Sequence, residues 1–141
     1  MTAATRNMTL ALAQRAEAHA LQLAANGGHA ISVSIVDASG FLVAFAKMDG
    51  AKLLTIHLTH HKAYTAARMG QPTHAFLARL QRDNLQIDCF GDDKFTALPG
   101  GVPVIVDGEL IGAVGVGGIT PQGDQEVAEQ VAHFAEQCAK E

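Results

Sequence analysis

The 141-residue sequence predicts one α/β domain of the α+β type over residues 1–141, in which a mostly antiparallel sheet packs against helices. Two observations support this fold class. Segments of strand-like composition occur in two pairs, and a tight turn joins the members of each pair. Segments with apolar residues at helical spacing precede, separate and follow these pairs. The expected order is therefore helix, two strands, two helices, two strands and a final helix.

The first expected element is an amphipathic helix that ends near Ala25. Its apolar residues recur at intervals of three and four, and Asn26-Gly27-Gly28 is a typical helix C-terminus. Thr9, Thr5 or Thr2 can cap its first turn. Charged residues interrupt the apolar positions, so this segment does not resemble the apolar part of a signal peptide.

The first strand pair follows this helix. Residues 31–37 alternate β-branched residues with serine, and residues 41–46 are mostly apolar. Asp37 opens a short turn that ends at Gly40, and an aspartate in such a turn commonly accepts hydrogen bonds from the backbone that follows it. The pair therefore predicts an antiparallel hairpin.

Two helices are expected next, over residues 53–69 and 74–84. Gly70 ends the first helix, and Thr73 is the expected cap of the second. Residues 86–99 show no periodic pattern and are expected to be irregular.

The second strand pair lies at residues 102–106 and 109–116. Asp107-Gly108 between them is a signal for a type I′ hairpin turn. The last helix is expected over residues 125–140, with Asp124 as its cap rather than as an acid in a site.

The composition indicates a globular protein that hides apolar surface. Apolar residues make up 48% of the chain and charged residues 17%, which is more apolar than a typical soluble domain. We therefore expect part of the surface to be buried between subunits of a homo-oligomer. The net charge of −4, without any run of Lys or Arg, argues against non-specific binding to nucleic acid.

The sequence also predicts the compartment and the state of the cysteines. No stretch reaches the ~20 apolar residues of a membrane helix, so a cytoplasmic protein without membrane contact is expected. Cys89 and Cys138 fit no CxxC pattern, and two reduced thiols are expected, with one disulfide as the alternative. A nucleophilic role for Cys89 would need a neighbouring base, for which the sequence has no local signal.

Eight short segments carry a resemblance to known proteins. They are VSIVDASG (33–40), MDGA (48–51), KAYTA (62–66), GQPT (70–73), PGGVP (99–103), DG (107–108), IGAVGV (111–116) and GDQEVA (123–128). Together and in this order they resemble the GlcG/HbpS-like family of haem-binding and haem-degrading domain proteins. The same family includes the C-terminal domain of PduO-type corrinoid proteins.

This resemblance implies a profilin-like arrangement, in which an antiparallel sheet of about five strands is flanked by helices on both faces. It also implies self-association, from dimers up to octamers. Some members resemble haem binders, which makes haem a candidate cofactor. Many others occur among catabolic enzymes, which implies a small-molecule ligand and a catabolic setting.

The helix over residues 53–69 carries the most informative group of polar residues. His57 lies three positions before His60 and four before His61, so each pair shares one helix face. Two imidazoles on one face can ligate a metal or bind an anion, and Lys62 follows directly. The spacing predicts that this helix lines a pocket; the alternative is an exposed or subunit-facing helix with solvated histidines. Because no third ligand completes a zinc motif, no metal ion is assigned.

Two glycine pairs and one aspartate are further candidates. Gly100-Gly101 can present backbone N–H groups to a carboxylate or an oxyanion, with a strand-entry turn as the alternative. Gly117-Gly118 indicates close approach of a ligand, with tight helix-on-sheet packing as the alternative. Asp49, on the loop before the helix, is a candidate to pair with Lys62 or a histidine and to set its charge state.

These residues support two hypotheses about function. In the first, the protein binds haem or another small ligand, one of the helix histidines or His19 ligates iron, and Lys62 or the glycine amides meet the propionates. In the second, it is a cofactor-free hydrolase or tautomerase of aromatic catabolism, acting on a small unsaturated carboxylate or ring-cleavage product. Lys62 and the glycine amides would then hold the anion, while a histidine or Asp49 moves protons. A structural subunit of an assembly is the third hypothesis.

Overall fold

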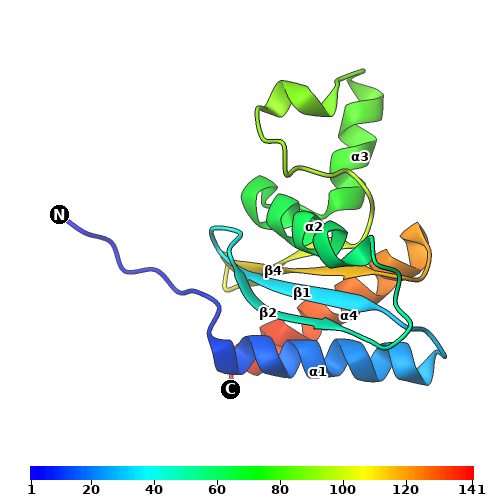
Figure 1. Cartoon of the computed structure of the whole chain (residues 1–141). Helices are drawn as coiled ribbons and strands as arrows, with labels where there is room; N and C mark the ends of the chain where they lie inside the picture. Colours follow the sequence, from blue (N-terminus) through cyan, green and yellow to red (C-terminus); the bar gives the residue numbers. More distant parts are fainter.

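The structure, a computed structural model, describes residues 1–141 and confirms the predicted order of elements. The elements are α1 (Leu10–Asn26), β1 (Ser32–Asp37), β2 (Leu42–Lys47), α2 (Thr55–Met69), α3 (Thr73–Arg82), the short 3-10 helix η1 (Ile87–Phe90), β3 (Gly101–Val106), β4 (Glu109–Gly117) and α4 (Pro121–Ala139). They form three layers, with the sheet between α1 and α4 on one face and α2 on the other (Figure 1).

The sheet has four strands in the order β2-β1-β4-β3, and all neighbouring strands are antiparallel. This confirms an antiparallel sheet flanked by helices on both faces, but the expected number of about five strands is wrong. Residues 86–99 add no strand, because they form η1 and irregular backbone. The two hairpins meet through β1 and β4, so each half of the chain contributes one central strand.

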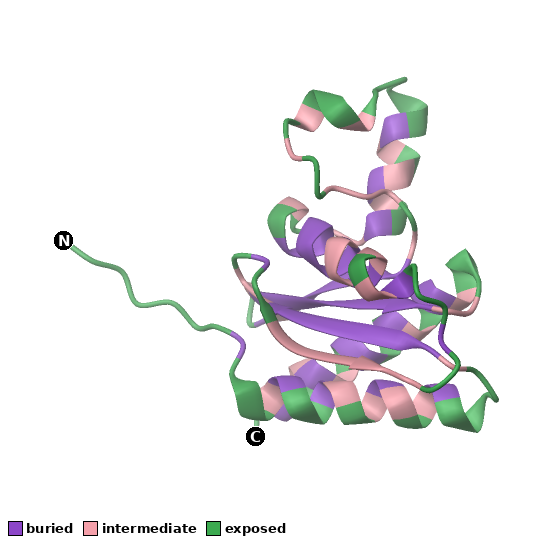
Figure 2. Ribbon diagram, viewed as in Figure 1, coloured by how far each residue is buried: buried purple, intermediate pink, exposed green.

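The main core lies between the sheet and the layer of α1 and α4. Figure 2 shows β1 and β4 buried along most of their length, whereas β2 at the edge is half-buried. The strands contribute valines and isoleucines, and the helices contribute mainly alanines. Small side chains on one face of α1 let this helix lie close to the strands; they are Ala13, Ala16, Ala20 and Ala24.

α2 packs against the opposite face of the sheet through small and polar side chains. At Gly115 of β4, a Cβ atom would collide with the backbone carbonyl oxygen of Thr59. Four buried hydroxyl groups join α2 to β1 in two pairs, Ser32 with Thr55 at 2.8 Å and Ser34 with Thr59 at 2.9 Å. We call these four residues the hydroxyl seam. Since buried hydroxyl groups need partners, the seam fixes the position of α2 along β1.

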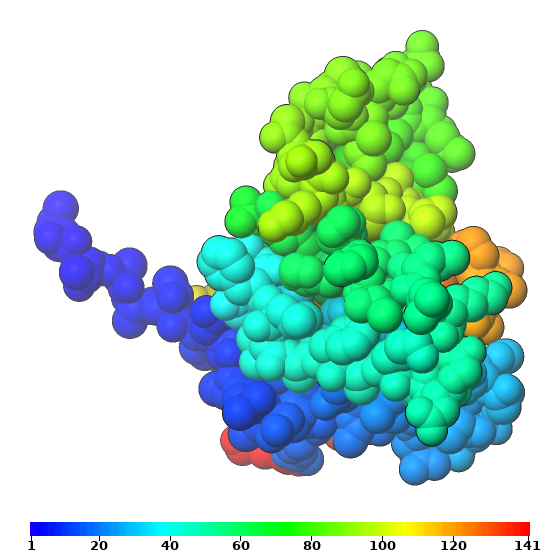
Figure 3. All heavy atoms as spheres, in the orientation of Figure 1, coloured from blue at the N-terminus to red at the C-terminus, as the bar shows by residue number.

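α3 and η1 stand away from the sheet on the side of α2 (Figure 1), and the space-filling view shows them as a projecting lobe (Figure 3). Aromatic packing holds this lobe together, because the ring of Phe76 packs edge-on against Phe90 at 5.0 Å and Phe95 at 5.9 Å. The Tyr64 hydroxyl of α2 donates to Asp92 at 2.6 Å. This hydrogen bond ties the loop after η1 to α2.

The local turn predictions are confirmed. The Asp37 carboxylate accepts from the backbone N–H groups of Ser39 at 2.9 Å and Phe41 at 3.0 Å. Asp107 and Gly108 both have positive φ angles, 51° and 79°, as a type I′ turn requires. Both turns are set by residues adjacent in sequence.

The helix starts are confirmed in one case and wrong in two. Thr9 caps α1 by accepting the N–H of Leu12. α4 begins earlier than expected, with Thr120 as its cap and Pro121 in its first turn, so the cap assigned to Asp124 is wrong. Thr73 is the first residue of α3 rather than its cap. None of the helices combines the length and the apolar composition needed to cross a membrane.

Candidate functional site

The three histidines of α2 lie in two different environments. His57 is exposed, and His61, one turn later, is half-buried near the loop that follows η1. His60 instead faces the β1–β2 turn, where its Nε2 atom lies 3.3 Å from the carbonyl oxygen of Gly40. Its ring also packs edge-on against Tyr64. His60 therefore contacts this turn as well as its neighbour His61, since the two imidazole ring centroids lie 6.1 Å apart.

His61 has the environment best suited to ligating a metal. Burial lowers its pKa below the usual value of 6.5, and the nearby histidines and Lys94 lower the pKa further. Asp92 opposes this shift. A neutral imidazole keeps a nitrogen lone pair free, which is the form that binds iron.

Two leucines share one side of α2 with His57 and His61, because Leu54 and Leu58 lie three positions before them. Leu54 is 63% exposed and Leu98 is 46% exposed, and both line one cavity with Leu58. Exposed apolar residues that gather beside polar groups are typical of binding surfaces. We call His57, His61 and these three leucines the histidine face.

Lys62 points into the protein, unlike the exposed His57 and the half-buried His61. Its Nζ atom donates to the carbonyl oxygen of Val116 at 2.8 Å and to Asp124 Oδ2 at 3.1 Å. The side chains of Lys62 and Asp124 are only 3% and 8% exposed. Burial lowers the pKa of Lys62, and the charge of Asp124 partly offsets this shift. The expected pairing of Asp49 with Lys62 is wrong, because Asp49 is exposed and makes no ion pair.

The glycine pair before β3 belongs to the same buried region. The N–H of Gly100 donates to the side chain of Gln125 at 2.8 Å, and the N–H of Gly101 donates to the Thr73 hydroxyl at 2.9 Å. Both amides are therefore already bonded within the chain and are not free to bind an oxyanion. The structure shows the strand-entry turn that the sequence left as the alternative. A Cβ atom at Gly100 would also lie 2.8 Å from Lys62 Nζ.

A cavity of about 150 Å³ opens beside the buried ion pair. Lys62, Asp124 and the backbone of Gly117-Gly118 line it, together with Lys52 and the turn that begins α4. Gly117 also packs close to Thr59, so this glycine pair serves both tight helix packing and access to a cavity.

Other candidate residues lie elsewhere. His19 of α1 stacks on Phe134 of α4 at 4.0 Å, on the opposite face of the sheet from α2. Cys89 is exposed, Cys138 is buried, and both are free thiols. No group of three or more His, Cys, Asp or Glu side chains is arranged to hold a metal ion.

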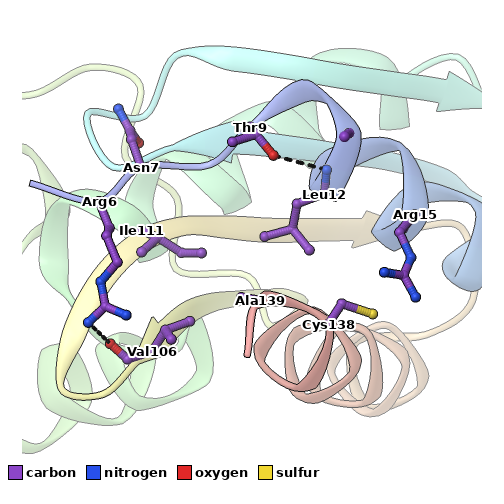
Figure 4. Close-up of a pocket in the computed structure, with 10 residues that line it drawn as sticks. Arg6, Asn7, Thr9, Leu12, Arg15, Val106, Ile111, Cys138 and Ala139 are labelled. Carbon is purple, nitrogen blue, oxygen red and sulfur yellow. Dashed lines mark hydrogen bonds between the residues drawn. The ribbon is translucent and has the colours of Figure 1, made fainter. Parts of the chain in front are cut away.

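A larger cavity of about 330 Å³ lies at the far end of the molecule, between the start of α1 and the end of α4 (Figure 4). Leu12, Val106 and Ile111 give it apolar walls, and Arg6 and Arg15 stand at its margins. Arg6 already pairs with two carboxylates and Arg15 pairs with a third, so neither guanidinium is free. No local pattern in the sequence connects these residues.

The residue that sequence reasoning missed is Asp124. It lies 62 positions from Lys62, and no local pattern connects the two. In the structure, the KAYTA, GQPT, PGGVP and GDQEVA segments meet at this point, through Lys62, Thr73, Gly100-Gly101 and Asp124-Gln125. The only signal for this pairing in the sequence was that Lys62 and Asp124 both lie in segments that carry the family resemblance.

Comparison with known proteins identifies relatives over most of the chain. The family described as "Haem degrading protein HbpS-like" matches residues 8–133. A 15.0 kDa protein in the dhaT–dhaS intergenic region of Citrobacter freundii is 34% identical over 122 residues, which cover 84% of this chain and 82% of that protein. Protein GlcG of Escherichia coli K12 is 35% identical over 86 residues, covering 61% of this chain and 63% of GlcG.

Solved structures agree with this result. The Klebsiella pneumoniae protein ORFY superposes with a TM-score of 0.88 at 29% identity, covering 96% of this chain and 94% of ORFY. A PduOC chain crystallised as its haem complex superposes with a TM-score of 0.81 at 27% identity, covering 92% of this chain and 94% of that chain.

Proposed function

The chain belongs to the haem degrading protein HbpS-like family, and on this basis we propose that it binds haem on the histidine face. The observation that carries the proposal is the environment of His61. Its half-buried imidazole has a lowered pKa and shares one side of α2 with Leu54 and Leu58, by helical spacing. The haem complex of the similar PduOC chain supports the choice of ligand.

The residues of the histidine face fit a porphyrin. Haem requires an axial ligand for iron, apolar contact for its ring and cations near its propionates. His61 provides the ligand, with His57 one turn away on the same side of α2. Leu54 and Leu98 provide apolar contact, and exposed Lys94 provides a cation close to His61. Bound haem would supply redox chemistry at its iron.

The volume of the cavity beside the histidine face limits where haem can bind. Pockets that enclose a drug-sized ligand measure roughly 300–1,000 Å³, and the cavity beside Leu54 and Leu98 measures about 150 Å³. Haem would therefore be held against the histidine face rather than inside the chain. A second copy of the protein would cover its exposed side, in keeping with the apolar fraction of 48%. Light scattering with and without haem tests this association.

The test of haem binding is a titration with haemin followed by absorbance. We expect a saturable Soret shift for the wild-type protein, loss of most of the shift in His61→Ala, and weaker binding in His57→Ala. His133→Ala is the matched control, because His133 is exposed on α4, in the layer on the opposite face of the sheet from α2. A wild-type titration that matches an unrelated control protein, or full binding after both α2 histidines are removed, would disprove the proposal.

A second candidate function is a cofactor-free enzyme in a cytoplasmic catabolic pathway. One observation favours it: Lys62 is buried next to Asp124 at the wall of an open cavity. Buried groups with shifted pKa values are common among residues that move protons. Turnover of a small unsaturated carboxylate by the wild-type protein, and its loss in Asp124→Asn, would support this function over haem binding.

A further inference from the structure

The cavity beside Lys62 and Asp124 adjoins the histidine face, because Leu54, Leu58 and Leu98 line it as well. Besides these leucines, Ile119 and two prolines, its lining consists of two lysines, one aspartate, two threonines and two glycines. Its volume of about 150 Å³ equals roughly five water molecules, at about 30 Å³ each in the liquid. A ligand held here is therefore small, with charged or polar atoms for the lysines and some carbon for the leucines.

Lys62 has hydrogen-bonding capacity left over. An ammonium group has three N–H donors, and Nζ has two acceptors in the chain, Val116 and Asp124. Burying an ion pair contributes little to stability when its hydrogen bonds are incomplete. The third N–H of the Lys62 ammonium has no acceptor in the chain. Because Lys62 lines the cavity, an oxygen atom of a ligand there can accept this N–H.

Both carboxylate oxygens of Asp124 already accept hydrogen bonds from within the protein. Its Oδ1 atom accepts the N–H of Ile119 at 2.9 Å, and its Oδ2 atom accepts from Lys62. The carboxylate thus joins the turn after β4, the start of α4 and the middle of α2. It fixes Nζ in place and leaves Lys62 as the donor available to a ligand.

The charges around the cavity favour an anion. Lys52 and Lys62 are its cations and Asp124 is its only carboxylate, so the lining is positive although the whole chain has a net charge of −4. Thr120 and Pro121 also line it, and they begin the 19-residue helix α4. The N-terminal end of a helix carries partial positive charge and attracts carboxylates.

We propose that this cavity binds a hydroxy- or oxo-carboxylate of about two to four carbons, the size that its volume admits. The ligand carboxylate lies toward Lys52 and the start of α4, and its hydroxyl or keto oxygen accepts the third N–H of Lys62. This site shares leucines with the histidine face but does not include the proposed haem ligands His57 and His61, and the inference does not rest on the haem proposal.

The test is saturation-transfer difference NMR on the methyl group of L-lactate, which reports weak binding even to large oligomers. We expect a saturable signal with lactate and none with lactamide, which has the same shape without the charge. Lys62→Met removes the ammonium group that donates to the hydroxyl oxygen of lactate, so this variant should abolish the signal. Thermal denaturation establishes whether this variant is folded.

Lys52→Glu decides the question independently, because Lys52 is exposed and its replacement leaves the buried ion pair intact. We expect it to weaken lactate binding about tenfold, since it reverses a charge at the cavity. Lys94→Glu makes the same change on the neighbouring loop, outside the cavity, and should bind as the wild type does.

Three outcomes overturn the inference. The first two are the absence of a saturable signal from the wild type and equal binding of lactate and lactamide. Unchanged binding in Lys52→Glu also overturns it. The lactate signal should persist in His61→Ala. If haem binding fails and lactate binding is intact, this inference is retained. If lactate binding fails and haem binding is intact, the haem proposal is retained.

Discussion

Lys62 Nζ and Asp124 Oδ2 lie 3.1 Å apart inside the protein, although 62 residues separate them in sequence. Their ion pair joins α2 to α4 across the end of β4. An ion pair that is this deeply buried is costly to break from one side, because the remaining charge has no partner.

The first prediction concerns the stability of this pair. Lys62→Met should lower the free energy of unfolding by about 3–5 kcal/mol, because it leaves the Asp124 carboxylate buried without its partner. The double variant Lys62→Met/Asp124→Asn should lose less than the sum of the two single losses. Denaturant unfolding of the three variants measures this coupling. Additive losses would mean that the two groups do not stabilise one another.

The second prediction concerns the contact between α2 and β4. Gly115→Ala should be strongly destabilising, by several kcal/mol, because its Cβ atom would overlap the backbone of α2 at Thr59. Gly117→Ala is the matched control in the same strand. Its Cβ atom would meet only side-chain atoms, those of Thr59 at 3.0 Å and of Thr55 at 3.3 Å. Equal thermal stabilities of the two variants would show that α2 can move away from the sheet.

The third prediction concerns pH. The pKa of His61 is lowered in the folded state, so the unfolded chain binds this proton more readily. The stability contributed by the neutral imidazole is fully present above the unfolded pKa of about 6.5 and is lost as the pH falls through the lower, folded pKa. His61→Gln should flatten this part of the stability profile. Unfolding midpoints measured between pH 7.5 and pH 5 test this, and His133→Gln should keep the wild-type slope.

The fourth prediction concerns the loop after η1. Tyr64→Phe removes the hydroxyl that donates to Asp92 and keeps the ring that packs against Phe95. The hydrogen bond has a charged acceptor, so its loss should cost about 1.5–3 kcal/mol. Amide hydrogen exchange should speed up in residues 92–98 and stay unchanged in the sheet. Uniform acceleration across the chain would instead indicate global destabilisation.

The sequence predicted most of the fold because its signals are local. The turn at Asp37 and the turn at Asp107-Gly108 depend on neighbouring residues alone, and both are correct. The start of α4 was also marked locally, since Thr120-Pro121 is a typical cap followed by a first-turn proline. A carboxylate before a helical pattern is an equally common signal for a helix cap, and this signal led to the wrong prediction of Asp124 as the cap of α4.

The candidate site was predicted only in part, because its geometry depends on contacts between distant segments. Helical spacing placed His57 and His61 together, but it could not show that His60 faces Gly40. Glycine composition at Gly100-Gly101 indicated free amides, whereas Gln125 and Thr73 already accept their N–H groups. Which partner satisfies a polar group is decided by the tertiary fold.

The hydroxyl seam has a mechanical consequence. Ser34 and Thr59 are hydrogen-bonded beneath α2, and Gly115 lies in backbone contact with the same turn, so the helix can neither slide nor rotate on the sheet without breaking buried hydrogen bonds. α2 is therefore a rigid support for whatever binds its outer surface. Any structural response to a ligand must come from the α3–η1 lobe and its loop, which Tyr64 and a few aromatic rings hold in place. Motion in this protein is thus expected to be hinged at the lobe, while the three-layered body stays fixed.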